Sequence, residues 1–192
     1  MDYFTDQTFE KLKFNLEPLV RGEYENCVFR HCDFSNCDLS GIKFTNVEFF
    51  ACNLSLVKLE NTALRGVNFR ECKMLGLHFE NCNRFGMNFR FENCQLNHSS
   101  FYKTKINKTT FRNSSLKEVD FTESNLTDAV FQNCDLAGVL FENTILEKAD
   151  FRSSVNYSID PERNIILKAK FSILELSGLL DKYEIEIDRS IL

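Results

Sequence analysis

Large apolar residues recur at every fifth position along most of the chain. The frame runs from Tyr24 to Phe89 and, after a slip of two residues, from Leu96 to Phe151, with Arg84 as the exception. A period of five fits neither the period of a helix nor that of a flat strand, so either element would scatter these side chains around its surface. The pattern therefore predicts a chain that turns regularly, with one pentapeptide on each side of a square coil.

Four pentapeptides make one turn of such a coil, so residues twenty apart should stack. Like shapes pack in register along the axis of a solenoid, and aromatic rings stack at about 4.5 to 7 Å. We therefore expect inward rings in a column that contains only phenylalanine: Phe9, Phe29, Phe49, Phe69, Phe89, Phe111, Phe131 and Phe151.

The residue two positions before each large one is small, and all eight cysteines belong to this class. Because a buried Cys behaves as a small hydrophobe, we expect inward, reduced thiols. Cys27, Cys32 and Cys37 lie on successive sides, whereas Cys32, Cys52 and Cys72 share a column. Neither arrangement brings four ligands together tetrahedrally, as zinc requires, so we expect no metal site.

Units such as residues 32–36 (CDFSN) and 37–41 (CDLSG) resemble the pentapeptide-repeat family. The resemblance implies an all-β fold, a right-handed quadrilateral β-helix. We expect this β-helix, with an N-terminal cap, over residues 1–155. Residues 156–192 are expected to form a C-terminal turn, helix and tail that cap the coil and support dimerisation.

The C-terminal segment leaves the five-residue frame. Ser172 and Glu175 form a capping box that predicts a helix through about Tyr183, and one side of that helix is apolar and suited to covering the coil end. That side comprises Ile173, Leu176, Leu179, Leu180 and Tyr183. The apolar residues that remain predict a homodimer interface: Leu174, Ile185, Ile187, Ile191 and Leu192.

The exit from the coil, an Asp-Pro turn at Asp160 followed by an apolar segment, is similar to that of the Qnr-type quinolone-resistance members. This similarity implies dimers joined through their C-terminal ends and an action on DNA gyrase and topoisomerase IV. Those members commonly carry longer loops, whereas this chain shows only the two-residue slip.

Composition and motifs argue against an enzyme. The chain has 192 residues and a net charge of −5. It contains no Gly-rich phosphate loop, nucleophile elbow or paired acid and base, and its three histidines occupy outward positions in different turns. We expect no catalytic residue and no cofactor. Because the sequence shows no apolar run long enough to span a bilayer and no signal peptide, we expect a cytoplasmic protein with no membrane partner.

Charge and the break in the pattern supply the candidate partner-binding residues. Residues 24–151 contain 16 acidic and 14 basic side chains, yet acidic residues gather after Lys117. Either a solvated mixed surface or a partner-binding stripe explains that grouping, and the candidates are Asp120, Glu123 and Asp128. Around Arg84 the pattern fails, so an outward bulge is expected there, with Phe85 replacing Arg84 in the core. This bulge is either a tolerated insertion or a recognition feature that includes Arg84, Phe85 and Arg90.

Two functional hypotheses follow. The first is a non-catalytic rod that binds DNA gyrase or topoisomerase IV and protects it from quinolones by partial DNA mimicry. The second is a cytosolic scaffold for another partner. Direct nucleic-acid binding is not expected, because the aromatic side chains are assigned to the core.

Overall fold

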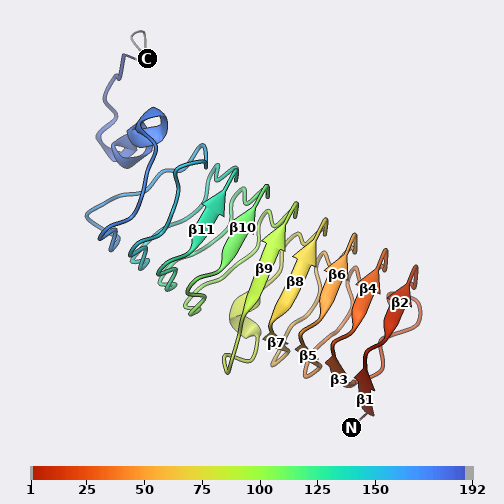
Figure 1. Cartoon of the computed structure of the whole chain (residues 1–192). Helices are drawn as coiled ribbons and strands as arrows, with labels where there is room; N and C mark the ends of the chain where they lie inside the picture. The colour runs from red at the N-terminus through yellow and green to blue at the C-terminus, as the bar shows by residue number, and fades with distance from the viewer. Residues whose placement is uncertain (1, 189–192) are drawn as a thin grey trace.

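The structure is a computed structural model that describes residues 2–188. It is a mostly-β parallel solenoid of about seven turns with a short helical segment at the C-terminal end, which confirms the fold predicted from the five-residue frame. Figure 1 shows the turns stacked along one axis, from the first turn at the red end to the helical segment at the blue end.

Two of the four sides form regular strands that pair in parallel with the turns above and below. The first side, face 1, comprises β1 (Asp2–Thr5), β3 (Gly22–Glu25), β5 (Lys43–Thr45) and β7 (Ala63–Arg65). The next side, face 2, comprises β2 (Thr8–Glu10), β4 (Val28–Arg30), β6 (Glu48–Phe50), β8 (Val67–Arg70), β9 (Phe89–Glu92), β10 (Thr110–Arg112) and β11 (Val130–Gln132). Phe29 pairs with Phe49, so the register is twenty residues.

The other two sides pair through single parallel bridges. Face 3 follows face 2 and includes the bridge between Asp33 and Asn53. Face 4 follows face 3 and includes the bridges of Ser100 with His78 and Asp120, beside the short helix η1 (Phe79–Asn81). Because the chain visits the four faces in order, faces 2 and 4 lie on opposite sides of the rod.

Sharp corners join the faces. A left-handed backbone recurs at five-residue intervals; examples are Asn26, Asn36 and Asn46, with φ of 52°, 59° and 53°. Asn tolerates this region because its short polar side chain bonds locally, and Gly adopts it without steric cost. Gly66, with φ of 63°, occupies one such corner. The polar residues of the repeat therefore set the turns as well as the solubility.

The core contains the expected column of stacked phenylalanines with one correction. Phe69 stacks on Phe91 at 5.3 Å between ring centroids, and Phe91 stacks on Phe111 at 5.1 Å. The fifth ring of the column is therefore Phe91, and the prediction of Phe89 was wrong. Phe89 pairs with Val67 and occupies the inward position that usually holds a small residue. The two extra residues thus enter before β9.

The break in the repeat is an outward loop, residues 83–88. Arg84 is exposed, as expected, but Phe85 is 78% exposed and does not replace it in the core. The space is filled by Phe89, which is 2% exposed and lies 5.4 Å from the ring of Phe79. A large side chain at a small position therefore compensates for the missing apolar residue.

The ladder continues past residue 155, where the sequence placed a boundary. Ile145 pairs with Ile165, and the ring of Phe171 stacks on Phe151 at 5.4 Å. At the other end, Asp2–Thr5 pairs with Gly22–Glu25, so the N-terminal residues form the first turn of the coil.

The C-terminal helical segment consists of η2 (Ile173–Leu179) and η3 (Asp181–Tyr183). The hydroxyl of Ser172 accepts a hydrogen bond from the amide of Leu174, as an N-cap does. Contact with the coil is made by Gly178, whose carbonyl accepts from the amide of Ile159 at 2.9 Å. A Cβ on Gly178 would lie 2.1 Å from the carbonyl oxygen of Tyr157, so only glycine permits this approach. Within residues 2–188, no helix has the length and hydrophobicity needed to cross a membrane.

Candidate functional site

Face 4 carries the strongest concentration of acidic side chains on the rod. Within residues 2–188, its outward positions hold four basic residues, Arg21, Lys58, Lys103 and Arg163, and Arg21 pairs with Asp38 at 3.1 Å. Its acidic residues are Asp38, Glu60, Glu80, Asp120, Glu123, Glu142, Asp160 and Glu162. Each turn rises by roughly the 4.8 Å that separates hydrogen-bonded strands, so these carboxylates form a stripe along the rod. We call it the acidic face.

The opposite side, face 2, is weighted toward positive charge. Its basic residues are Lys11, Arg30, Arg70, Arg90, Arg112, Arg152 and Lys170, against five acidic ones. The net charge of residues 24–151 is therefore near zero because a negatively charged face and a positively weighted face offset each other. Sorting the charges by their place in the five-residue frame would have shown this from the sequence, whereas counting them along the chain did not.

The structure divides the three acidic candidates. Asp120 and Glu123 lie on the acidic face, and Asp128 lies one side further along the same turn, at the corner between faces 1 and 2. Asp120 accepts from the amide of Thr122 at 2.8 Å and forms no ion pair with any described residue. Glu123 pairs with Lys103 at 3.4 Å. Asp120 is thus the candidate with the most available charge.

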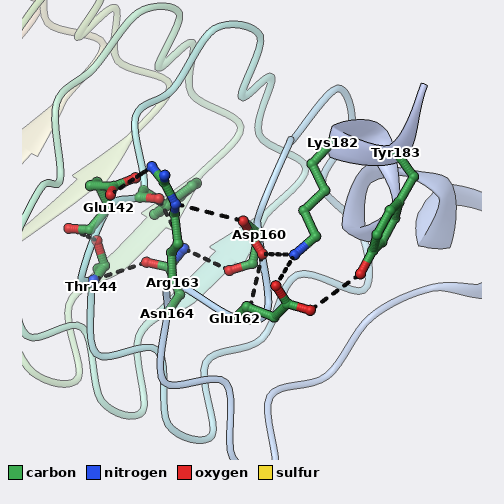
Figure 2. Close-up of polar contacts among 9 residues, drawn as sticks. Glu142, Thr144, Asp160, Glu162, Arg163, Asn164, Lys182 and Tyr183 are labelled. Carbon is green, nitrogen blue, oxygen red and sulfur yellow. Dashed lines mark hydrogen bonds and ion pairs between the residues drawn. The ribbon is translucent and has the colours of Figure 1, made fainter.

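At the C-terminal end of the acidic face, cations neutralise the carboxylates (Figure 2). Arg163 pairs with Glu142 at 3.0 Å, and Lys182 bridges Asp160 at 2.8 Å and Glu162 at 2.6 Å. The hydrogen bond from Lys182 is the main reason that the pKa of each of these two carboxyls lies below its ordinary value. Lys182 belongs to η3, so these ion pairs clamp the helical segment to the last turn. The open part of the acidic face lies nearer the middle of the rod.

The loop 83–88 holds Phe85 in a fixed position outside the core. The amide of Phe85 donates to the side chain of Asn83 at 3.0 Å, and Asn83 donates to Asn61 at 2.9 Å. The guanidinium of Arg65 lies 5.3 Å from the ring centroid of Phe85, and its Nε donates to the carbonyl of the same residue at 3.3 Å. Arg84 and Arg90, which precede and follow Phe85 in the chain, are exposed. The sequence identified these residues but missed Arg65, which lies one turn earlier.

The described part of the C-terminal candidate interface is exposed. Leu174, Ile185 and Ile187 are 59%, 56% and 43% exposed, while Ile191 and Leu192 lie outside the described residues. The helix side that was expected to cover the coil end is also largely exposed, and Ile173 on this side is 72% exposed. Among the residues of this side, only Leu179 is partly buried against the core. An open groove runs between the helical segment and the tail, lined in part by Ile173, Leu174, Leu176, Leu180 and Ile187.

The cysteines and histidines are the side chains of this chain that most resemble catalytic or metal-binding groups. All eight cysteines are free thiols, and seven are buried. Burial raises the pKa of Cys134 to about 12, so this thiol is protonated at neutral pH. His78 and His98 are exposed and lie beside Glu80 and Glu118. Among residues 2–188, no group of three or more His, Cys, Asp or Glu side chains is placed to hold a metal ion.

Comparison with known sequences decides the family. Residues 23–90 and 84–157 match the family described as "Pentapeptide repeat region". The chain belongs to the pentapeptide-repeat family. This family is generally non-catalytic. No curated protein matches the chain.

Two solved structures of QnrB1 share the fold. A trypsin-treated variant of QnrB1, a plasmid-mediated fluoroquinolone resistance protein, is 20% identical with a TM-score of 0.51, covering 97% of this chain and 100% of that one. Full-length QnrB1 is 15% identical with a TM-score of 0.52, covering 96% and 100%. HetL, a pentapeptide-repeat protein involved in heterocyst differentiation regulation from the cyanobacterium Nostoc sp. strain PCC 7120, is 13% identical with a TM-score of 0.47, covering 88% and 87%.

Proposed function

We propose that this pentapeptide-repeat protein is a non-catalytic rod that binds DNA gyrase or topoisomerase IV in the cytoplasm. In this proposal it protects the enzyme from quinolones by partial DNA mimicry. The fold shared with QnrB1, a fluoroquinolone resistance protein, supports this choice of partner.

The acidic face is the observation that carries the proposal. A DNA-binding channel attracts a row of negative charges, and duplex DNA presents one charge per roughly 1.7 Å of axis. The acidic face offers one or two carboxylates on most turns of roughly 4.8 Å, so its charge density is lower than that of DNA. Such a surface would compete with DNA at part of the channel rather than along its whole length, which is why we describe the mimicry as partial.

Gyrase supercoiling with and without ciprofloxacin tests the proposal. The protein should restore supercoiling in the presence of the drug and inhibit it at higher concentration. Asp120→Lys should weaken both effects, because it reverses an unpaired carboxylate on the acidic face. Asp128→Lys makes the same charge change one side away and should have a smaller effect. Failure of the wild-type protein to bind or protect the cognate gyrase would reject this function.

The C-terminal surface supports a second part of the proposal, a homodimer. Leu174, Ile185 and Ile187 are exposed beside the groove, and Ile191 and Leu192 complete the set chosen from the sequence. A contact between identical ends would place two rods end to end about a two-fold axis.

A scaffold for another cytosolic protein is the alternative. The observation that favours it is the neutralised end of the acidic face, where Lys182 and Arg163 pair with the carboxylates. A mixed row of charges suits a protein partner with its own mixed surface better than a channel built for phosphates. A pull-down with the protein as bait that captures another protein and no topoisomerase would favour this alternative.

A further inference from the structure

A second charged surface, positive and centred on Phe85, lies away from the acidic face. It surrounds the corner between faces 1 and 2 at the loop 83–88. Its basic side chains are Arg65, Arg84, Arg90, Lys105 and Lys108. We call these five residues and the ring of Phe85 the Phe85 patch. None of these five cations forms an ion pair with a described residue. The patch therefore has positive charge available for a ligand.

Register places these cations on neighbouring turns. Arg90 pairs with Asn68 on the turn before and with Thr110 on the turn after, so it lies between the turns of Arg65 and Lys105. The spacing between turns is roughly 4.8 Å. Glu92, a carboxylate on face 2, is already engaged by Arg70 at 3.6 Å and Arg112 at 3.8 Å. Asp128 occupies the same corner one turn after Lys108 and forms no ion pair with a described residue.

The exposed ring of Phe85 allows the patch to bind a ligand by aromatic stacking as well as by charge. Arg65 and the Asn83 turn hold Phe85, and 78% of the residue is exposed. Arg65 covers one face of the ring, and none of the described aromatic pairs includes it, so the other face is open to a ligand. A fixed ring among cations is the arrangement that binds single-stranded nucleic acid: a base stacks on the aromatic surface while its phosphates meet the basic side chains.

We propose that the Phe85 patch binds a short segment of single-stranded nucleic acid, with one base stacked on Phe85. The sequence argued against direct nucleic-acid binding on the ground that the aromatics were in the core. Phe85 is the most exposed of the described aromatic residues that depart from that premise. The net charge of −5 does not prevent local contact, since salt screens charges beyond about 8 Å at physiological ionic strength. A segment of Asp and Glu alone fits less well, because carboxylates offer no flat ring system to stack on Phe85.

Fluorescence anisotropy with labelled oligo-dT and oligo-rU of about 12 nucleotides tests the proposal. Binding should weaken as salt rises, with a logarithmic slope of about −0.7 for each phosphate contacted. Phe85→Ala should weaken binding about 5- to 150-fold, the range for the loss of one stacked base. Leu56→Ala, which removes an exposed apolar side chain from a corner of face 3, should leave binding unchanged.

Charge variants separate the contribution of the patch from that of net charge. Arg84→Ala and Lys105→Ala should each make the salt slope shallower by about 0.7. Lys73→Ala on face 3 removes the same charge far from the loop and should not change the slope. Comparison of the dT and rU arms shows whether the ligand is DNA or RNA, and circular dichroism confirms that each variant is folded.

Three outcomes would overturn the proposal. One is no binding of either oligomer at protein concentrations up to about 100 µM, the weak limit of ordinary non-specific binding. Another is equal binding of a duplex of the same length together with no effect of Phe85→Ala, because duplex bases cannot stack on the ring. The third is displacement by a poly-glutamate peptide as efficient as that by oligo-dT, which would indicate an acidic protein partner. No topoisomerase is present in this assay, so its result is independent of the gyrase experiment.

Discussion

Phe85 and Phe89 lie four residues apart in the interrupted turn and have opposite environments. Phe85 is 78% exposed and rests on Arg65, whereas Phe89 is 2% exposed and fills the core beside Phe79 and Phe91. Both residues are phenylalanines in the same short stretch of sequence. They differ because the two-residue insertion places the side chain of Phe85 outside the coil and that of Phe89 inside it.

This difference predicts unequal effects on stability. Phe89→Ala should lower the free energy of unfolding by about 3–5 kcal/mol, because it removes a buried ring and leaves a cavity. Phe85→Ala should change it by no more than about 0.5 kcal/mol, as for most exposed side chains. Urea unfolding followed by circular dichroism measures both, and similar losses in the two variants would contradict the arrangement of the loop.

The same pair of residues shows how far sequence reasoning reached. The frame from Tyr24 to Met74 and from Leu96 to Phe151 predicted the buried residues because each position is fixed by many repeats. Between them the frame slips by two, and both Phe89 and Phe91 are suitable for the column. Periodicity alone could not choose, because the choice depends on where the extra residues leave the coil.

At the scale of elements, the C-terminal segment differed most from expectation. An α-helical period predicted one apolar side turned toward the coil. The segment instead forms short helices of the 3₁₀ type, in which side chains three residues apart eclipse, so the same sequence presents Ile173 and Leu176 to solvent. The contact falls to Gly178, whose lack of a side chain carried no signal in the hydrophobic pattern.

The clamp that holds this segment should weaken in acid. Lys182 lowers the pKa of Asp160 and of Glu162, so the clamp is complete above the ordinary values of 3.8 and 4.5 and is lost as pH falls through the lowered values. Hydrogen exchange at the amide of Ile159, which donates to Gly178, should therefore quicken at low pH relative to the intrinsic rate. In Lys182→Met the amide should exchange faster already at neutral pH and show little further change in acid. An identical pH profile in both proteins would argue against the clamp.

At the scale of the whole molecule, the rod has three distinct surfaces: the acidic face, the Phe85 patch and the apolar C-terminal end. The patch lies at the corner between faces 1 and 2, and face 2 is opposite the acidic face. A rod of this kind can therefore present different partners to different sides without one blocking another.

The apolar C-terminal end predicts a homodimer, and charged substitutions at this end should dissociate it into monomers. Light scattering of the wild-type chain should give twice the 22.4 kDa of one chain. Leu174→Asp combined with Ile187→Asp should give a monomer, because both residues border the exposed groove. Leu56→Asp, at an exposed corner of face 3, is the matched control and should stay dimeric. A wild-type protein that is already monomeric, like a chain ending at Tyr183, would remove the basis for this interface.

The nearest-neighbour architecture of the coil has a consequence for how the protein can change over time. Each turn bonds only to the turns above and below, with partners about twenty residues away, and the loop 83–88 is accommodated while register is recovered by the next turn. Energetic effects of substitutions several turns apart should therefore be additive, since distant sites share no partners. A lineage could exchange one outward patch for another without re-optimising the rest, so relatives with the same backbone would be expected to diverge in partner while keeping a common core.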